Sequence, residues 1–520
     1  MDALARHLKQ GRALRLQNRL EAARRQFEAA LRLDPTSARA HAGYGATLAR
    51  LGEIPRALAA YWESLRLDPD QPRIYGALGN VYLNQGRSQL AVDCLRQAVS
   101  QSPDDEVLRS NLLYSLNLDD RATPSEVFRE HAEFGNRLRA LAGPKPPWRA
   151  RRVLRIGYVS GDFCEHVVTY AVEPVLENHR RSLFEITLYS STPRPDSITR
   201  RLRRFASHWR DVRKLSDEQL ARIIRRDGID ILVDLGGHTS IARLGTFARR
   251  AAPVQVNFQG YPNTSGLATM DYRITDEWAD PPGLTDQWYT EKLVRLPGGF
   301  FCLCPEPGAP DVSKPACLDG RPVTFGSCSK PAKWSPSTIR TWAAILRGVP
   351  ESRLLLHHSA TGDAQTRVLE EFALYGISPH RICLTGPVSW KAHWEWFHQV
   401  DIALDPFPYN GTTGSCETLW MGVPFVALAG RTHAARVGVS ILSRIGLECL
   451  VARDESAYAA LAIRLAGDPE QLATIRAGMR DRLLASTLFD CRRFTRGLEA
   501  AYREMWEETG REAGLRSKVE

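Results

Sequence analysis

A proline recurs every 34 residues near the start of the chain, at Pro35, Pro69 and Pro103. Other positions share this offset: Asn18, Gly52 and Gly86; Ala23, Ala57 and Ala91; Phe27, Tyr61 and Leu95; and Ala30, Ser64 and Ala98. Gly or Asn ends a helix in the left-handed conformation, a small Ala lets two helices approach, and a bulky side chain fills the groove between them. Proline then ends the unit. The period predicts an array of stacked helix pairs.

A 34-residue unit of this kind resembles the tetratricopeptide repeat (TPR). Such arrays usually present a concave groove to a peptide, so we expect a polypeptide partner; a structural spacer is the alternative. Asp68 and Asp70 form a D-x-D pair, a spacing that binds a divalent metal in many sugar transferases, but Pro69 between them marks a repeat junction. We interpret this pair as a helix stop and not as a metal site.

The period disappears from about Asp119. The stretch "TPSEVFREHAEFGNRLRALAG" predicts a single linker helix, because Thr123 and Glu126 have the spacing of a capping box. The sequence "GPKPP" over residues 143–147 then breaks that helix. We place a domain boundary there.

Beyond this boundary, apolar strands alternate with polar, helix-prone stretches. One series contains "VLRIGYVSGDF", "FEITLYSST" and "IDILVDLGGHT"; a second runs from "PVTFGSCSKPAKWSP" through "SRLLLHHS", "RICLTGPVS" and "VDIALDPFPYNGTTG" to "PFVALAG". Parallel strands joined by helices form doubly wound sheets, whose ligands lie beyond the carboxyl ends of the strands. The pattern predicts two Rossmann-like lobes that face each other across a cleft.

A turn of small residues, "YNGTTGSCETLWMGVP", opens directly onto a helix in the second series. Small residues let backbone N–H groups approach a ligand, and the first turn of a helix offers unpaired donors and partial positive charge. The turn therefore suits a phosphate. The alternative is a plain helix cap made by Thr413 or Ser415.

Several other polar side chains follow strands or begin helices. These candidates are His166, His238, Lys330, Lys333, His393 and Glu417. A lone His at a strand end is more often structural than catalytic, but several such ends that converge on one cleft favour a site. Lys333 precedes a Ser-Pro helix start, where its ammonium suits a diphosphate. We expect Glu417 in the first turn of its helix, where it either complements the dipole or accepts hydrogen bonds from ribose hydroxyls.

Charge and composition exclude some classes of protein. The net charge of +10 comes from Arg-rich helices and not from one basic block, which favours a solvated surface over a nucleic-acid site. The first residues lack a signal-peptide core, and no apolar run approaches the roughly 20 residues that cross a bilayer. We expect a cytoplasmic protein with no membrane contact. The ten cysteines form no CxxC pair, and Cys302, Cys304 and Cys317 lack the spacing of a zinc site, so reduced thiols are expected.

Several long motifs resemble the catalytic region of the O-GlcNAc transferase family, which includes the SPINDLY proteins. They are "DGIDILVDLGGHT", "APVQVNFQGYPNTSG", "DYRITDEWADPP", "EKLVRLPGGFF", "FGSCSKPAKWSPSTIRTWAAIL" and "LDPFPYNGTTGSCETLWMGVPFVALAG". They occur in order from about Val153 to Leu447, downstream of the repeats. The resemblance implies two lobes of the GT-B type, a sugar nucleotide as co-substrate with no cofactor and no metal, and inversion at the anomeric carbon as Ser or Thr of a protein is glycosylated.

The resemblance also implies a division of the chain. We predict a TPR array over residues 1–118, a linker helix and Pro-rich boundary over 119–150, and an N-terminal catalytic lobe over 151–320. A C-terminal nucleotide-sugar-binding lobe over 321–505 and a charged tail over 506–520 complete the chain.

Carried over residue by residue, the resemblance implies roles for the candidates. Donor contacts fall on Lys330, Lys333, His393, Thr412, Thr413, Glu417 and Lys292, with the backbone of the turn at Gly414 and Ser415 beside the phosphates. Lys333 matches a lysine that contacts the diphosphate, and His166 matches a histidine that faces the reacting centre. We hypothesise that His166 orients or deprotonates the acceptor; His238 and a donor phosphate oxygen are the other candidate bases.

Three features depart from the pattern of the O-GlcNAc transferases. Thr412 stands where the family has a His, Trp390 replaces a lysine that contacts the base, and the "GGHT" and "LDPFPY" motifs are closer to the SPINDLY branch, which uses GDP-fucose. The sequence therefore leaves the donor open between UDP-GlcNAc and GDP-fucose. Asn glucosylation and a non-catalytic repeat scaffold are two more candidate functions, and the acceptor protein and oligomeric state stay open.

Overall fold

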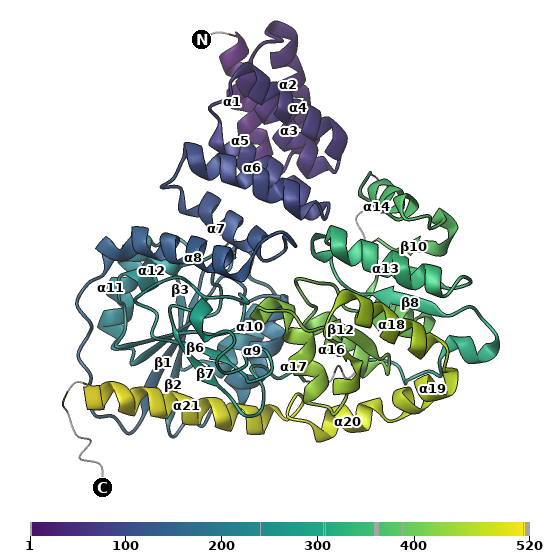
Figure 1. Ribbon diagram of the computed structural model, residues 1–520. Helices are drawn as coiled ribbons and strands as arrows, with labels where there is room; N and C mark the ends of the chain where they lie inside the picture. Colours follow the sequence, from purple (N-terminus) through teal and green to yellow (C-terminus); the bar gives the residue numbers. More distant parts are fainter. Residues whose placement is uncertain are drawn as a thin grey trace.

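The structure, a computed structural model, describes residues 3–239, 241–304, 306, 308–357, 363–386, 388–512 and 514. An array of helices stands on two α/β lobes that lie side by side (Figure 1). No helix within these described ranges is long and apolar enough to span a membrane.

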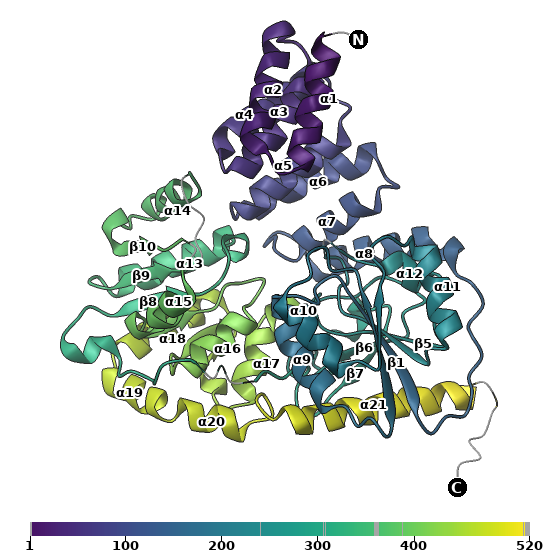
Figure 2. The ribbon, with the colours of Figure 1, turned by 180° about the vertical axis from the view of Figure 1, so that it is seen from behind.

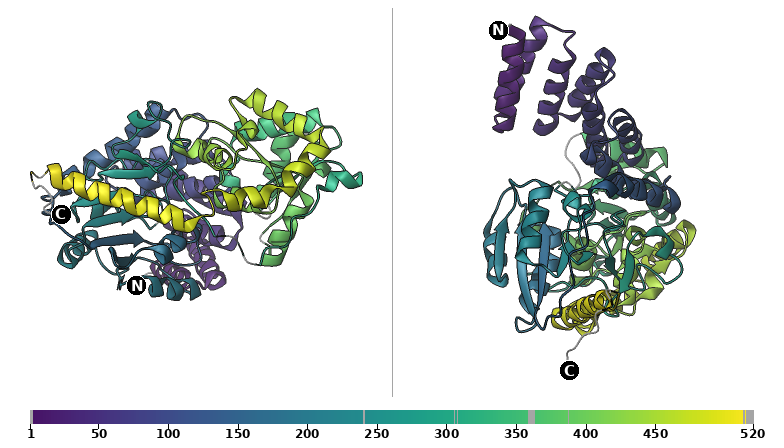
Figure 3. Two further views of the ribbon diagram at one scale, coloured as in Figure 1. Left: turned by 90° about the horizontal axis from the view of Figure 1, so that it is seen from below. Right: turned by 90° about the vertical axis from the view of Figure 1, so that its left-hand side faces the viewer.

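The repeats form antiparallel helix pairs that stack into a superhelix (Figure 3, right). The helices are α1 (Ala3–Leu16), α2 (Leu20–Leu33), α3 (Ala38–Leu51), α4 (Ile54–Leu67), α5 (Pro72–Asn84) and α6 (Ser88–Gln101). Positions in register behave as the period predicts: Phe27 and Tyr61 are buried, while Gly52 and Gly86 end their helices with φ of 83° and 75°. Helix α4 ends before Asp68, whose Oδ1 accepts a hydrogen bond from the N–H of Asp70, so the interpretation of the D-x-D pair as a helix stop is confirmed.

Two further helices, α7 (Glu106–Leu116) and α8 (Pro124–Leu138), join the array to the first lobe. The predicted linker helix is α8, and Thr123 caps it by accepting from the N–H of Glu126. This region is packed and not a free linker: a Cβ placed on Gly135 would lie 1.7 Å from the carbonyl oxygen of Gly266. Only Gly allows α8 to approach the lobe this closely.

Each lobe is built on a parallel sheet, which confirms the predicted fold class. The N-terminal sheet has the order β3-β2-β1-β4-β5-β6-β7 and the C-terminal sheet the order β10-β9-β8-β11-β12-β13. The first seven strands are β1 (Leu154–Ser160), β2 (Phe184–Ser190), β3 (His208–Asp211), β4 (Ile231–Asp234), β5 (Val254–Asn257), β6 (Tyr272–Thr275) and β7 (Lys292–Arg295). The others are β8 (Thr324–Ser327), β9 (Arg353–Leu356), β10 (Ile382–Leu384), β11 (Ile402–Leu404), β12 (Phe425–Leu428) and β13 (Val451–Ala452).

Helices cover these sheets. In the N-terminal lobe they are α9 (Val167–Asn178), α10 (Ser197–Leu202), α11 (Asp217–Asp227) and α12 (Leu244–Ala248). In the C-terminal lobe they are α13 (Pro336–Gly348), α14 (Asp363–Leu374), α15 (Trp390–Trp396), α16 (Thr413–Trp420), α17 (Val437–Ser443), α18 (Glu455–Ala466), α19 (Pro469–Ala477) and α20 (Met479–Ala485). Because every paired strand is parallel, the carboxyl ends of the strands in each sheet lie at a single edge.

The last helix, α21 (Cys491–Glu512), leaves the C-terminal lobe and runs along the base of the N-terminal lobe (Figures 1 and 2). Its buried side chains Phe494, Leu498 and Tyr502 belong to the core of the N-terminal lobe, and the ring of Phe494 stacks on Phe258. The predicted boundary between residues 505 and 506 falls within this helix. Its apolar face assigns α21 to the N-terminal lobe and not to the C-terminal lobe.

Candidate active site

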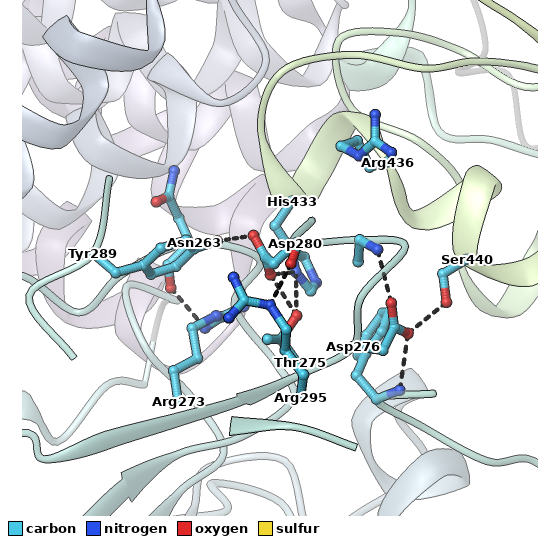
Figure 4. A network of polar contacts seen from close by, with 12 residues as sticks. Asn263, Arg273, Thr275, Asp276, Asp280, Tyr289, Arg295, His433, Arg436 and Ser440 are labelled. Carbon is cyan, nitrogen blue, oxygen red and sulfur yellow. Dashed lines mark hydrogen bonds and ion pairs between the residues drawn. The ribbon is translucent and has the colours of Figure 1, made fainter. Parts of the chain in front are cut away.

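The two lobes meet at a buried polar network (Figure 4). Asp280, which follows β6, accepts a hydrogen bond from His433 Nδ1 of the C-terminal lobe at 2.7 Å and another from the hydroxyl of Tyr289 at 2.9 Å. Burial alone would raise the pKa of Asp280, but His433 and Arg273 outweigh it and hold that pKa below its ordinary value. This pairing fixes one lobe against the other.

A second contact lies in the same network. Ser440 of α17 donates to Asp276 Oδ2 at 2.6 Å, and Arg436 Nε donates to the carbonyl of Trp278 at 2.9 Å. The carboxyl edges of the two sheets therefore face each other with a defined geometry, at the place of the predicted cleft.

The small-residue turn sits between β11 and α16. Thr412 precedes the helix with φ −127° and makes no side-chain cap hydrogen bond, and among the described residues nothing accepts from the N–H groups of residues 413–415. Ser415 instead donates to Asp405 Oδ1 at 3.2 Å, so neither Thr413 nor Ser415 makes a plain helix cap. The N-terminus of α16 keeps the unpaired donors that an anion needs.

Lys333 lies against this turn. It ends the short helix η5 (Pro331–Lys333) that follows β8. Its ammonium donates to the carbonyl of Asn410 at 2.6 Å and lies 4.3 Å from the centroid of the Tyr409 ring. Burial lowers the pKa of Lys333 to about 8, and the nearby charge of Asp405 opposes that shift. The structure thus joins the predicted lysine to the predicted phosphate turn.

Asp405, the residue directly after β11, is a site residue that the sequence motifs do not single out. Its side chain is 4% exposed, and its Oδ1 accepts hydrogen bonds from Gly411 N–H at 2.8 Å and from Ser415. Its Oδ2 is buried with no hydrogen-bond partner among the described residues. Burial raises the pKa of Asp405 to about 7, and the charge of Lys333 opposes this. Its position at the end of a central parallel strand was the signal that could have identified it.

A small cavity opens beside Asp405. The residues that line it come from the carboxyl ends of β8 and β11, the first residue of β12 and the first turns of α16: Ser327, Cys328, Ser329, Ala403, Leu404, Asp405, Gly414, Ser415, Thr418 and Phe425. The cavity therefore lies at the carboxyl edge of the C-terminal sheet, where a parallel sheet holds its ligands.

His393 and Glu417 lie together on neighbouring helices. His393 Nε2 is 3.4 Å from Glu417 Oε2, and His393 Nδ1 is 2.9 Å from Nε2 of His357. Helix α16 begins at Thr413, so Glu417 lies in the second turn and not in the first as predicted. Complementation of the helix dipole therefore does not explain this carboxylate. Lys330, at the start of η5, is exposed.

His166 lies on the opposite lobe, where it caps α9. Its Nδ1 accepts from the N–H of Val168 at 3.3 Å, and its side chain is 41% exposed. Tyr170 lies one turn along α9. Its pKa is raised first by burial and then by the charges of Glu165, in the same lobe, and of Glu417, in the C-terminal lobe. The charge of Glu417 on α16 therefore acts on the start of α9 from the opposite lobe.

Two predicted residues are not brought to this cleft. His238 is 1% exposed; its Nε2 donates to the carbonyl of Ser265 at 3.0 Å, and its Nδ1 accepts from Ser110 of α7 at 3.1 Å. Burial holds its pKa well below the ordinary value, so this neutral, fully bonded ring has a structural role. Lys292 begins the edge strand β7, at the end opposite to the cleft, and its ammonium pairs with Glu508 of α21 at 2.6 Å.

A family model, glycosyl transferase family 41, matches residues 140–304 and 318–498, which is more than half of the chain. The chain belongs to this family. Repeat models match upstream: a TPR repeat over residues 11–52 and 45–86, and a tetratricopeptide repeat over 72–105. The predicted repeats and the resemblance to the O-GlcNAc transferases are confirmed.

Family 41 relatives share much of this chain. It is 40% identical over 427 residues to the rice (Oryza sativa subsp. japonica) protein "Probable UDP-N-acetylglucosamine–peptide N-acetylglucosaminyltransferase SPINDLY", and the match covers 80% of this chain and 46% of that protein. It is 34% identical over 364 residues to the Arabidopsis thaliana protein "Probable UDP-N-acetylglucosamine–peptide N-acetylglucosaminyltransferase SEC". That match covers 68% of this chain and 37% of the Arabidopsis protein. The chain thus spans less than half the length of these curated relatives.

A solved structure extends the match to nearly the whole chain. A mutant of the Thermobaculum terrenum O-GlcNAc transferase superposes with a TM-score of 0.90 at 34% identity and covers 98% of both chains. The helical array and both family 41 lobes therefore have counterparts of the same arrangement.

Proposed function

We propose that this chain transfers N-acetylglucosamine from UDP-N-acetylglucosamine to Ser or Thr hydroxyls of a polypeptide. The observation that carries the proposal is the half-buried ammonium of Lys333 against the uncapped N-terminus of α16, at the carboxyl edge of a family 41 lobe. The names of the rice and Arabidopsis relatives supply the donor and the class of acceptor.

Charge supports a reaction without a metal catalyst. As the glycosidic bond to the donor breaks, negative charge develops on the leaving diphosphate. The ammonium of Lys333 and the N–H groups of residues 412–415 are placed to meet that charge. In this proposal Thr412, Thr413, Gly414 and Ser415 surround the phosphates through their backbone.

The remaining donor contacts follow from the same cleft. Glu417 accepts from the ribose hydroxyls, His393 lies near the base, and the exposed Lys330 supplies a further cation. Lys292 is left out of the donor site, because its ammonium pairs with Glu508 at the far end of β7.

His166 acts from the other side of the cleft. The proposed acceptor hydroxyl attacks the anomeric carbon from the face opposite the diphosphate, which inverts that carbon. Because His166 Nδ1 accepts from Val168, Nε2 carries the ring proton and orients the acceptor hydroxyl by donating to its oxygen. Removal of the acceptor proton by Nε2 requires the other tautomer, whose Nδ1–H would face Asp162 Oδ2, 3.7 Å away. A phosphate oxygen of the donor is the alternative base.

The TPR array binds the acceptor polypeptide in this proposal. Its position supports the role, because the turn between α5 and α6 touches the segment that carries Lys333. A Cβ on Gly86 would lie 2.4 Å from the carbonyl oxygen of Pro331, and the ring of Tyr114 lies 6.4 Å from that of Tyr409. A polypeptide along the array would therefore reach the cleft beside the donor phosphates.

Thermal unfolding with UDP and with GDP tests the donor. A ligand that binds only the folded state stabilises it by RT ln(1 + [L]/Kd), so UDP should raise the unfolding temperature more than GDP does. Hydrolysis and transfer assays with a panel of sugar nucleotides then identify the sugar. A larger shift with GDP, together with turnover of GDP-fucose, would replace the proposal by protein O-fucosylation.

One observation favours that second candidate. Trp390, at the start of α15, is 55% exposed where the O-GlcNAc transferases have a lysine that contacts the base. The panel of sugar nucleotides also tests for Asn glucosylation and for a chain without activity. Transfer to Asn would show glucosylation, whereas the absence of any nucleotide shift and of any hydrolysis would show a non-catalytic repeat scaffold.

A further inference from the structure

The apolar core of the helical array extends onto two segments of the C-terminal lobe. Ala332 and Tyr409 of that lobe pack against the core of the array, and so does Tyr114 of α7. Ala332 directly precedes Lys333, and Tyr409 begins the small-residue turn before α16. All four side chains are half-buried. The array therefore contacts both segments that the proposed function places at the donor phosphates.

Three side chains lead from α7 to the lysine. The ring centroids of Tyr114 and Tyr409 lie 6.4 Å apart with their planes inclined by 55°, which is within the range of roughly 4.5–7 Å for aromatic pairs. The ammonium of Lys333 lies 4.3 Å from the centroid of the Tyr409 ring, close enough for a cation–π attraction. The ring of Tyr409 therefore connects α7 to the ammonium.

The ammonium has a second contact of different origin. It donates to the carbonyl of Asn410 at 2.6 Å. Asn410 is fixed within the C-terminal lobe, because its Nδ2 donates to the carbonyl of Pro406 at 2.9 Å and its Oδ1 accepts from the N–H of Gly438 at 3.1 Å. The lobe thus supplies this contact by itself. The contact with the ring of Tyr409 is the one that α7 supports.

Helix α7 is itself held in place by both lobes. Directly after the helix, Asn117 Nδ2 donates to the hydroxyl of Tyr261 in the N-terminal lobe at 2.9 Å. A few residues further on, Asp120 Oδ2 accepts from the N–H of Ser337 in the C-terminal lobe at 2.9 Å. These bonds fix the end of the helix that carries Tyr114, so its ring has a defined position beside Tyr409.

We propose that Tyr114 is a positioning residue of the donor site, which holds the ammonium of Lys333 at the small-residue turn through the ring of Tyr409. The role of Lys333 rests on the proposed function, whereas the contacts that hold it do not. A displacement of a binding group by about 1 Å can cost on the order of 100-fold in rate. The helices before the lobes therefore serve the donor side of the reaction as well as the acceptor polypeptide.

Hydrogen exchange of the full chain without nucleotide tests the contacts. In Tyr114→Ala, backbone amides of residues 330–334 and 409–413 should exchange at least about 10-fold faster than in the wild type, because their packing against α7 is lost. Tyr44→Leu is the matched control. It removes a tyrosine ring that lies 5.8 Å from the guanidinium carbon of Arg56, on α3 and away from the lobes (Figure 1), so exchange in these two segments should stay unchanged.

Titration with UDP and with uridine tests the effect on the lysine. Because Lys333 meets the phosphates in the proposed function, Tyr114→Ala should weaken UDP binding about 3- to 10-fold and leave uridine binding within about 2-fold of the wild type. Tyr114→Phe keeps the ring and should restore the affinity for UDP. A ring with a merely structural role would change both affinities equally.

A second variant covers a failure of Tyr114→Ala to fold. Tyr409→Leu removes the ring beside the ammonium and should weaken UDP binding about 10-fold, whereas Tyr409→Phe keeps the ring and the affinity. Unchanged exchange in Tyr114→Ala and Tyr409→Leu would overturn the proposal, as would equal losses of UDP and uridine binding. If the wild-type chain binds GDP and not UDP, the proposed donor is wrong, and GDP and guanosine replace the pair. If it binds neither nucleotide, the proposed function fails, and the exchange rates alone decide the coupling.

Discussion

Replacing Lys333 by Met removes the ammonium from the phosphate turn while it keeps a side chain of similar length. The lowered pKa of Lys333, about 8 against 10.5, corresponds to a cost of roughly 3 kcal/mol for burying its charged form. The hydrogen bond from its ammonium to Asn410 offsets about 1.5–3 kcal/mol of that cost. The two effects nearly cancel, so the free energy of unfolding should change by less than about 2 kcal/mol.

Ligand binding should respond far more than stability. A charge-assisted hydrogen bond to a phosphate is worth about 1.5–3 kcal/mol, so Lys333→Met should bind UDP about 10- to 150-fold more weakly. At a UDP concentration about 100 times the wild-type Kd, UDP stabilises the wild-type chain by about 2.7 kcal/mol. The same concentration should stabilise the variant by only about 0.3–1.4 kcal/mol. Transfer to the acceptor should be abolished.

Lys292→Met provides the matched control. It removes the same charge from an exposed lysine that pairs with Glu508 away from the cleft, so UDP stabilisation and turnover should equal those of the wild type. Urea unfolding with and without UDP, together with a transfer assay, measures both effects. Wild-type UDP stabilisation in Lys333→Met, or an equal loss in Lys292→Met, would refute the placement of the diphosphate.

Two other substitutions test the buried charges. Because the charge of Asp405 raises the pKa of Lys333, Asp405→Asn should move the alkaline fall of kcat/KM from near pH 8 to lower pH, and an unchanged pH profile would count against this coupling. The folded pKa of Asp405, about 7, exceeds the ordinary value of 3.8, so the folded state binds one more proton than the unfolded state between these pH values. The free energy of unfolding of the wild type, relative to that of Asp405→Asn, should therefore fall as pH rises from about 4 to 7. Urea titrations at several pH values measure this difference. His433→Ala removes the hydrogen bond that His433 Nδ1 donates to the buried Asp280 and should cost about 1.5–3 kcal/mol in urea unfolding at pH 7. Since the folded pKa of Asp280 is lowered, this stabilisation is present above about pH 4 and is lost as pH falls further, so equal losses at pH 7 and pH 3 would contradict it.

The helical array and the parallel sheets could be predicted because each depends on a local pattern. Ala23, Phe27 and Ala30 repeat at an offset that has one structural explanation, and apolar runs such as "VLRIGYVS" become β1. Lys333 and the turn before α16 could also be predicted, since a strand end fixes where each begins. In these cases, the chemistry of the site depends on residues that are close in the sequence.

Other parts of the site depend on contacts between distant segments. His238 follows a strand much as His166 does, and nothing near it in the sequence reveals that Ser110 of α7 covers it. Lys292 lies in a family motif, yet its partner Glu508 lies on a helix that returns from the far end of the chain. The direction of a side chain and its covering helix are tertiary facts, which a motif does not carry.

The junction between the array and the lobes is a second consequence of tertiary packing. Arg367 of α14 donates to the carbonyl of Gly86, and Asp120, just after α7, accepts from the N–H and hydroxyl of Ser337 at the start of α13. With the contact of Gly86 on Pro331, these bonds attach the array to the segment that carries Lys333. In the proposed function, a peptide bound on the array would therefore be held at a fixed distance from the donor phosphates, and the geometry of transfer would not depend on a flexible linker.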